Sequence, residues 1–308
     1  MSIYELFTSK GPSGFGYGST AEQVTEGLSL EGQTILVTGC NSGLGQEAMR
    51  VLALRGARVV GTARTQEKAK VACAAVAGKT VPLACELSDP ASVRACVAAV
   101  KSQGIKLDAI ICNAGIMALP RLETKHGYEL QFFTNHIGHF ILVTGLLDQL
   151  TEAGRVVMLS SDAHTQAPKE GIQFDNLDGS KGYDNWKNYG QSKLANILFA
   201  KELARRFAGT KKTANAVHPG VINTNLSRHT NSVVAFALTA LSPLALKSVP
   251  QGAATEVYVA TNPRLADVSG EYFASSNVAR PRADANDAAL AKKLWEVSEK
   301  IVADLPAS

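Results

Sequence analysis

The chain lacks the sequence features of secreted, membrane-spanning and nucleic-acid-binding proteins. Its first residues include Glu5 and no basic start before an apolar run, which argues against a secretory signal peptide. No stretch reaches the roughly 18 apolar residues that a membrane span requires. The formal net charge of +4 is small for 308 residues, so we expect no nucleic-acid partner, although this charge would suit a phosphate-bearing ligand.

Cysteine is scarce and follows no disulfide or metal-binding pattern. The five cysteines are an odd number and no two have the C-x-x-C spacing, so we expect free, buried thiols in a reducing compartment. That compartment would be the cytoplasm. His136 and His139 have no further ligands at a useful spacing, which indicates structural histidines and no metal site.

The chain does have enough apolar material for one sizeable core. Hydrophobic residues make up 45% of it and charged residues 19%, and no repeat or linker divides it. Residues 1–32, rich in Gly, Ser and Thr, indicate an irregular leader. We therefore expect the leader to precede a single domain over residues 33–308.

Short β-branched runs alternate along this domain with longer helical patterns. The expected strands are 34–38, 58–62, 81–85, 107–112, 155–159, 214–217 and 270–274. The expected helices are 43–55, 66–77, 127–151, 189–207 and 250–261, with another that opens at Pro90. This order predicts a single doubly wound, Rossmann-type α/β domain with helices on both faces of a parallel sheet.

A glycine-rich turn connects the first expected strand to the first expected helix. Gly39 would allow the tight turn, and Gly43 and Gly45 would let backbone N–H groups and the helix N-terminus approach a pyrophosphate. The spacing is G-x-x-x-G-x-G rather than the common G-x-G-x-x-G. Together with Asn41, Ser42 and Leu44, these glycines are the candidate phosphate-binding residues.

The end of the second expected strand favours one nicotinamide cofactor over the other. A carboxylate here would accept hydrogen bonds from the adenosine ribose of NAD, but the strand ends at Thr62-Ala63-Arg64 without one. Arg64 can instead pair with a 2′-phosphate through its bidentate guanidinium. The sequence therefore favours NADP(H) over NAD(H), unless Arg64 is an ordinary surface arginine.

Two Y-x-x-x-K matches occur, and their surroundings separate them. Tyr183 and Lys187 lie among glycine, aspartate and asparagine, which is typical of a turn. Tyr189 and Lys193 open a segment with good helix formers, where positions i and i+4 share a face. A lysine ammonium beside Tyr189 would lower the phenol pKa from about 10 toward working pH. We therefore expect Tyr189 and Lys193 to carry the proton chemistry.

Polar residues follow two of the expected strands at the carboxyl edge of the sheet, where ligands bind in such folds. Ser160 and Ser161 end the fifth strand, and a hydroxyl there can bond a substrate oxygen. Asn113 ends the fourth strand at the same edge. Asn135 lies amid apolar residues of a helix, where it could hold a water, kink the helix or be a satisfied core amide.

In combination, these motifs resemble the short-chain dehydrogenase/reductase superfamily over roughly residues 33–275. The resemblance rests on TGCNSGLG, ICNAGI with Asp108 upstream, FFTNHIGHF, VVMLSSDAH, YGQSK and HPGVINT, in that order. NHIGHF, SSDAH, YGQSKLAN and HPGV are similar to the retinol dehydrogenase-like branch. The leader is similar to plant chloroplast relatives of that branch, which implies either a plant source, with an organelle stroma as the compartment, or a bacterial source. The chain has Glu86 where members usually have Asp, and a longer Ser161–Tyr189 interval than compact members.

The resemblance implies a role for each candidate residue. Tyr189 would be the general acid or base, Lys193 would lower its pKa and bind the nicotinamide ribose, and Ser161 would orient the carbonyl. Asn135 would hold the water of a proton relay. The further cofactor-binding residues that it implies are Glu86 and Leu87 beside the adenine, and Asn113, Ala114, Gly115, Pro219, Gly220, Val221 and Thr224, with the backbone near Val217, along the cofactor channel.

We thus expect an NADP(H)-dependent oxidoreductase that transfers a hydride between nicotinamide and a carbonyl or alcohol. Its substrate would be a bulky lipophilic aldehyde, ketone or alcohol, because the apolar segment after Gly220 could close over it as a lid near 222–249. The alternatives for the apolar run at 233–246 are a core segment and a weak membrane-surface patch. The alternative is a catalytically silent nucleotide-binding regulatory or interaction protein of the same fold. A serine hydrolase that uses Ser161 and His164 is excluded by the lack of a G-x-S-x-G elbow. Helix 189–207 could pair two copies into a homodimer or homotetramer, or cover the sheet.

Overall fold

The computed structural model describes residues 9–222 and 246–306. Its main sheet has eight strands in the order β10-β9-β8-β7-β4-β1-β2-β3. The strands are β1 (Thr34–Val37), β2 (Arg58–Ala63), β3 (Thr80–Ala84), β4 (Leu107–Cys112), β7 (Leu150–Leu159), β8 (Thr213–His218), β9 (Tyr272–Ala274) and β10 (Asn277–Val278). All neighbours pair in parallel except β9 and β10, which form an antiparallel edge. The predicted doubly wound fold is confirmed.

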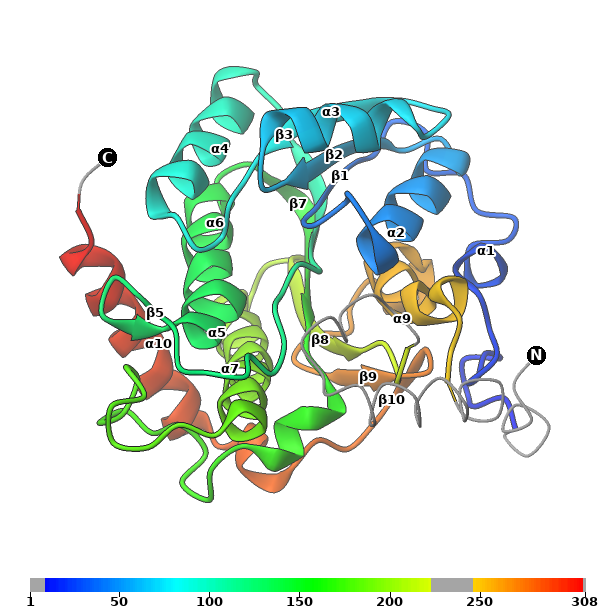
Figure 1. The fold of residues 1–308 in the computed structure, drawn as a ribbon. Coiled ribbons are helices and arrows are strands. Elements are labelled where there is room, and N and C mark those ends of the chain that lie inside the picture. Colours follow the sequence, from blue (N-terminus) through cyan, green and yellow to red (C-terminus); the bar gives the residue numbers. More distant parts are fainter. Residues whose placement is uncertain (1–8, 223–245, 307–308) are drawn as a thin grey trace.

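Helices cover both faces of this sheet (Figure 1). On one face lie α1 (Ala21–Val24), α2 (Gly43–Leu54), α3 (Gln66–Ala74) and α9 (Val249–Thr261). On the other lie α4 (Pro90–Ser102), α5 (Leu130–Phe132), α6 (Gly138–Leu146), α7 (Asn185–Arg206) and α10 (Ala288–Asp304). Asp89 caps α4 ahead of Pro90, and Asp184 caps α7 through the N–H groups of Trp186 and Lys187.

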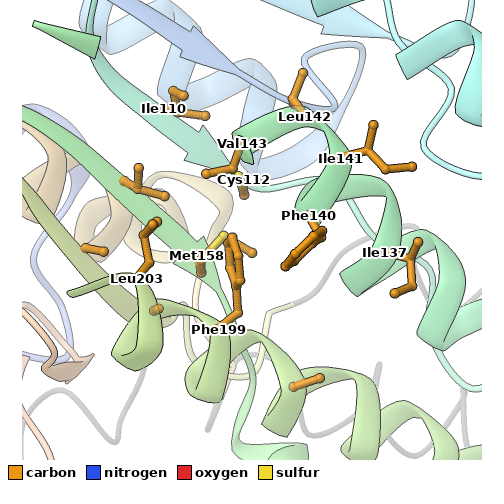
Figure 2. Packing of buried hydrophobic residues seen from close by; sticks show 14 of the residues in the cluster. Ile110, Cys112, Ile137, Phe140, Ile141, Leu142, Val143, Met158, Phe199 and Leu203 are labelled. Carbon is orange, nitrogen blue, oxygen red and sulfur yellow. The ribbon is translucent and has the colours of Figure 1, made fainter. Parts of the chain in front are cut away.

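Two apolar clusters hold the layers together, one on each face of the sheet. In the larger, Phe140 of α6 packs against Phe199 of α7, and Met158 and Ile110 of the sheet belong to the same cluster (Figure 2). Strand segments covered on both faces are apolar, which is why β4 is apolar from Ala109 to Cys112 and β7 from Val156 to Leu159. Helix α7 is sandwiched between the sheet and α10, so it covers the sheet, while the oligomeric state stays a prediction.

One segment differs from the sequence-based expectation. The single helix expected at 127–151 is wrong: a small hairpin of β5 (Thr124–Lys125) and β6 (Tyr128–Glu129) precedes α5. A π-helical turn (Phe133–Ile137) then separates α5 from α6, and strand β7 has begun by Leu150. The polar Glu129 explains the start, because its carboxylate accepts the Phe132 N–H at 2.8 Å and caps the helix. Helix α10 was not anticipated.

The leader docks on the domain through specific contacts. The Asn277 amide accepts from the Ser13 N–H at 3.0 Å and donates to the Phe15 carbonyl at 3.0 Å. The Phe15 ring meets Tyr258 of α9 edge-on. The leader contains the short helix α1, which Thr20 caps. The division into leader and domain at residue 33 stays a prediction.

Candidate active site

The glycine-rich turn has no room for a side chain where its backbone lies closest to neighbouring protein atoms. Gly39 has φ +75° and Gly43 φ +60°, conformations that favour glycine. A Cβ on Gly45 would lie 2.4 Å from Asn113 Nδ2 and 2.5 Å from the Gly39 carbonyl oxygen. The turn is therefore shaped by backbone alone, as close approach to a phosphate requires.

The N-terminus of α2 opens directly from this turn. Ser42 is the N-cap residue, yet its side chain makes no capping hydrogen bond. Asn41 and Ser42 are exposed, whereas Leu44 is buried and anchors the helix. First-turn N–H groups without an intrahelical or side-chain acceptor form a ready anion-binding site.

Hydrogen bonds tie the ends of β1 and β4 together behind the turn. The Asn113 amide donates to the Thr38 carbonyl at 2.7 Å, and the Ala114 N–H donates to Thr38 Oγ1 at 2.9 Å. A Cβ on Gly115 would lie 3.0 Å from Asn135 Oδ1 and 3.3 Å from Lys193 Nζ. Because Gly115 has no side chain, the chain after β4 can lie directly against Asn135 and Lys193, two residues expected at the reacting centre.

The fold brings Ser161, Tyr189 and Lys193 to one place at the carboxyl edge of the sheet. The Lys193 ammonium lies 5.7 Å from the centre of the Tyr189 ring and donates to the Leu159 carbonyl at 3.1 Å. The Ser161 hydroxyl lies close enough to the Tyr189 phenol to lower its pKa. Ser160 is turned away, because its hydroxyl donates to the Lys193 carbonyl at 2.8 Å.

Burial dominates the electrostatics of this cluster. It raises the pKa of the Tyr189 phenol to about 12, and the hydrogen bond with Ser161 opposes that rise. Burial also lowers the pKa of the Lys193 ammonium to about 8. The phenol is therefore protonated at neutral pH, which suits a proton donor. That Lys193 lowers the phenol pKa stays a prediction.

The other Y-x-x-x-K pair has different surroundings. The Tyr183 hydroxyl donates to the Leu119 carbonyl at 2.6 Å and accepts from the Gln131 amide at 3.2 Å. Lys187 is exposed in the first turn of α7. Tyr183 therefore ties two loops together, and its hydroxyl is occupied by structural bonds.

Asn135 lies in the π-helical turn, fully buried, with its side chain saturated by protein partners. Its amide oxygen accepts from the Ile116 N–H at 2.8 Å, and its amide nitrogen donates to the Ile116 carbonyl and to Ser192 Oγ, each at 2.9 Å. Of the three expected roles, the side chain therefore fits the satisfied core amide. That Asn135 holds the water of a proton relay stays a prediction.

His139, which we expected to be only a structural histidine, belongs to the same network. Its Nδ1 lies 2.9 Å from the Asn135 carbonyl, which can only accept, so Nδ1 carries the proton. Its Nε2 then accepts from the Thr38 hydroxyl at 3.0 Å. Burial lowers the His139 pKa to about 4 and keeps the ring neutral. The feature of the sequence that could have identified His139 is its place as a histidine among the apolar residues that open α6.

The remaining candidates are spread around this centre. Arg64 follows β2, is exposed, and forms no ion pair with any residue of 9–222 or 246–306. The Glu86 carboxylate accepts from the Ser88 N–H and hydroxyl, so it caps a turn, and Leu87 is buried against Gly138. The turn after β8 consists of the buried Pro219, Gly220 with φ +95°, and Val221, which is 56% exposed.

Two of the expectations lie partly or wholly outside the described residues. Thr224 and most of the lid near 222–249 fall within residues 223–245. Among the described residues, no helix is long and apolar enough to span a membrane, and no group of three potential ligands could hold a metal ion. All five cysteines are buried and free, as expected.

The fold and the arrangement at its carboxyl edge define a Rossmann-type oxidoreductase with a nicotinamide cofactor. The family model for short chain dehydrogenase matches residues 33–234, more than half of the chain. The chain therefore belongs to the short-chain dehydrogenase/reductase family. It falls in the retinol dehydrogenase-like branch, whose chemistry is that of alcohols and carbonyls.

Named relatives and solved structures agree with this assignment. The chain is 43% identical to short-chain dehydrogenase TIC 32 A, chloroplastic, of Brassica napus, over 99% of this chain and 100% of that one. It is 37% identical to retinol dehydrogenase 13 of Homo sapiens, over 89% and 86% of the two chains. An uncharacterized protein from Mycobacterium Paratuberculosis has a similar structure, with a TM-score of 0.75, 33% identity, and coverage of 92% and 98%. A metagenomic blue fluorescent protein in complex with NADPH has a TM-score of 0.63, 25% identity, and coverage of 80% and 97%.

Proposed function

We propose that the protein is an NADP(H)-dependent oxidoreductase that interconverts a carbonyl and an alcohol, with Tyr189 as general acid or base. The observation that carries this proposal is the convergence of Ser161, Tyr189 and Lys193 beside a backbone-lined phosphate turn. A protein that only bound a nucleotide would need neither Ser161 to orient a substrate oxygen nor Tyr189 to donate a proton.

The described residues fit a dinucleotide along the sheet edge. The pyrophosphate would lie at Gly39, Gly43 and Gly45, where a Cβ at the last position would meet backbone. Asn113 to Gly115 and the turn from Pro219 to Val221 would flank the nicotinamide half, and Glu86 with Leu87 the adenine. When bound, the nicotinamide supplies or accepts the hydride.

The chain's own residues would manage the proton and the substrate oxygen. For reduction, Ser161 would hold the carbonyl oxygen while Tyr189 Oη–H donates its proton to it. The Lys193 ammonium, held by the Leu159 carbonyl, would stabilise the phenolate that remains. For oxidation, the same groups act in reverse, and the phenolate accepts the alcohol proton.

Two exposed apolar side chains near this edge, Trp186 and Val221, support a lipophilic aldehyde, ketone or alcohol as substrate. Free thiols support a reducing compartment, either the cytoplasm or, as the names of the Brassica napus relatives suggest for those proteins, a chloroplast.

Mixing the protein with NADPH and a panel of aldehydes and ketones while following cofactor absorbance tests the activity. Tight NADPH binding without any turnover would instead favour the catalytically silent alternative.

Arg64→Ala tests the preference for NADP(H). A charged hydrogen bond to the 2′-phosphate is worth about 1.5–3 kcal/mol, so NADPH affinity should fall roughly tenfold to a hundredfold. NADH lacks this phosphate, so its affinity should change little. Dissociation constants for both cofactors, measured by fluorescence titration, give the comparison.

Arg58→Ala is the matched control, since Arg58 is also exposed but lies at the opposite end of β2. It should leave both affinities unchanged. Equal losses of NADPH and NADH binding in Arg64→Ala would contradict the assignment of Arg64 to the 2′-phosphate.

A further inference from the structure

The peptide group that joins Ser161 to Asp162 is held by a histidine ring on each side. Its carbonyl, that of Ser161, accepts from the His164 Nδ1–H at 2.7 Å and from the His164 backbone N–H at 3.0 Å. Its N–H, that of Asp162, donates to His218 Nδ1 at 3.1 Å. These bonds constrain the backbone that carries the Ser161 hydroxyl, the group expected to orient the substrate oxygen.

The His164 ring is fixed at its far end as well. The Ser161 carbonyl can only accept and the Arg282 N–H, 3.1 Å from Nε2, can only donate, so Nδ1 carries the proton and Nε2 accepts. Burial lowers the His164 pKa and so favours this neutral ring, which lies against the Tyr272 ring with centroids 5.2 Å apart. One tautomer in one orientation therefore satisfies both bonds.

The donor to Nε2 comes from a segment that is itself tied down. Arg282 follows β10, and its guanidinium donates to the Ala167 and Pro168 carbonyls at 2.7 Å each. A segment near the C-terminus is thereby bonded to the chain that leaves Ser161. His164 lies between the two and bonds both of them.

The Ser161 hydroxyl transmits this arrangement to the reacting centre. It accepts from the Ala163 N–H at 3.2 Å and forms the hydrogen bond that opposes the rise in the Tyr189 pKa. We infer that His164 is a positioning residue, whose Nδ1–H holds the Ser161 peptide so that the hydroxyl faces both Tyr189 and the substrate oxygen. This inference rests on the proposed function. In this role His164 acts on the reaction only through Ser161.

Two substitutions separate the two ends of the His164 ring. Asparagine places its amide near the position of Nδ1 and can still donate to the Ser161 carbonyl, but it does not reach the Arg282 N–H. Glutamine places its amide near the position of Nε2 and can still accept from that N–H, but it no longer holds the Ser161 carbonyl. His164→Gln should lower kcat roughly tenfold to a hundredfold, because a misplacement of about 1 Å can cost about a hundredfold. His164→Asn should retain most of the native kcat.

Kinetics at saturating NADPH with the best carbonyl substrate, urea unfolding and a fluorescence titration of NADPH measure the effects. Each variant loses one bond of a buried ring, so both should unfold at a lower urea concentration than the native sequence. Only His164→Gln should lose kcat, and the NADPH dissociation constant should stay the same in both. His164→Leu, which loses both bonds, gives the same contrast with asparagine if the glutamine variant fails to fold.

A Ser161→Ala background tests whether His164 acts through Ser161. Once the hydroxyl is absent its position no longer matters, so adding His164→Gln should cause no further loss of kcat. His136→Gln is the matched control, since His136 is also buried and bonds Ser298 of α10 through Nε2 at 2.8 Å, a bond that glutamine can keep. This control should leave kcat unchanged.

The outcomes separate the role of His164 from the proposed function. An unchanged kcat in His164→Gln, equal losses in the glutamine and asparagine variants, or a further loss in the Ser161→Ala background would overturn the role of His164 and leave the proposed function standing. If the unsubstituted protein turns over none of the aldehydes or ketones, or their alcohols, the proposed function fails and this inference fails with it.

Discussion

Tyr189→Phe is expected to lower kcat by roughly 10²–10⁴-fold, the range that positioned proton transfer contributes. The substitution removes only the hydroxyl, so the buried ring keeps its edge-on contact with Trp186 and its place beneath Lys193. NADPH should therefore still bind, with a dissociation constant close to that of the unsubstituted protein. Steady-state kinetics with the best aldehyde and a fluorescence titration of NADPH measure the two quantities.

Tyr183→Phe is the matched control, because it removes the same hydroxyl from the other Y-x-x-x-K pair. The Tyr183 hydroxyl bonds the Leu119 carbonyl and the Gln131 amide, so its loss should cost about 1 kcal/mol of stability and leave kcat nearly unchanged. Equal losses of kcat in the two variants would mean that the helical setting of Tyr189 and Lys193 gives them no function that Tyr183 and Lys187 lack. The assignment of Tyr189 would then fail.

Glu256→Gln is expected to stabilise the protein strongly at pH 8 and hardly at all near pH 4.5. Glu256 lies on α9 and is 1% exposed, and neither carboxylate oxygen has a hydrogen-bond partner among residues 9–222 and 246–306. Burial raises its pKa from 4.5 to about 8. The folded protein thus retains a proton that the unfolded chain releases between these two values.

Because the folded state binds more protons in this window, the free energy of unfolding of the native sequence falls as pH rises from 4.5 to about 8. Glutamine has a similar shape but does not ionise, so its burial carries no pH-dependent cost. The difference between the variant and the native sequence should therefore grow over this window to about 3–5 kcal/mol. Urea unfolding at a series of pH values measures it.

Glu26→Gln, an exposed glutamate in the leader, is the control and should change the unfolding free energy by less than about 0.5 kcal/mol at every pH. A Glu256→Gln effect that is the same at both ends of the window would falsify the view that the native carboxyl is buried and protonated. A variant that is less stable at pH 8 would point to a partner that the carboxylate needs.

Much of the fold followed from local patterns. The β-branched runs at 34–38 and 107–112 predicted β1 and β4 almost to the residue, because strands buried on both faces have no alternating polar positions. The stretch 127–151 failed for a tertiary reason. Its apolar residues are compatible with one long helix, but Glu129 caps a later start and the Asn135 side chain bonds Ile116 and Ser192, within a π-helical turn.

Part of the candidate site could also be predicted from local sequence patterns. Spacing and helix propensity separated Tyr189 from Tyr183, and the position of Ser161 after a strand placed it at the ligand edge. Neither signal could identify His139 as the link between Thr38 and the Asn135 carbonyl, because those bonds join residues far apart in the chain. The exposed face of Trp186 beside Tyr189 also depends on what the rest of the chain leaves uncovered.

The sequence by itself determined the order of strands and helices, the glycine turn and the four-residue spacing of Tyr189 and Lys193. These depend on backbone preferences and side-chain periodicity over a few residues. Only the tertiary structure decided which polar atoms meet and which titrating groups are buried. Burial sets the pKa values of Tyr189, Lys193 and Glu256, because the free energy of a charge depends on the solvent and dipoles around it, which are supplied by distant parts of the chain.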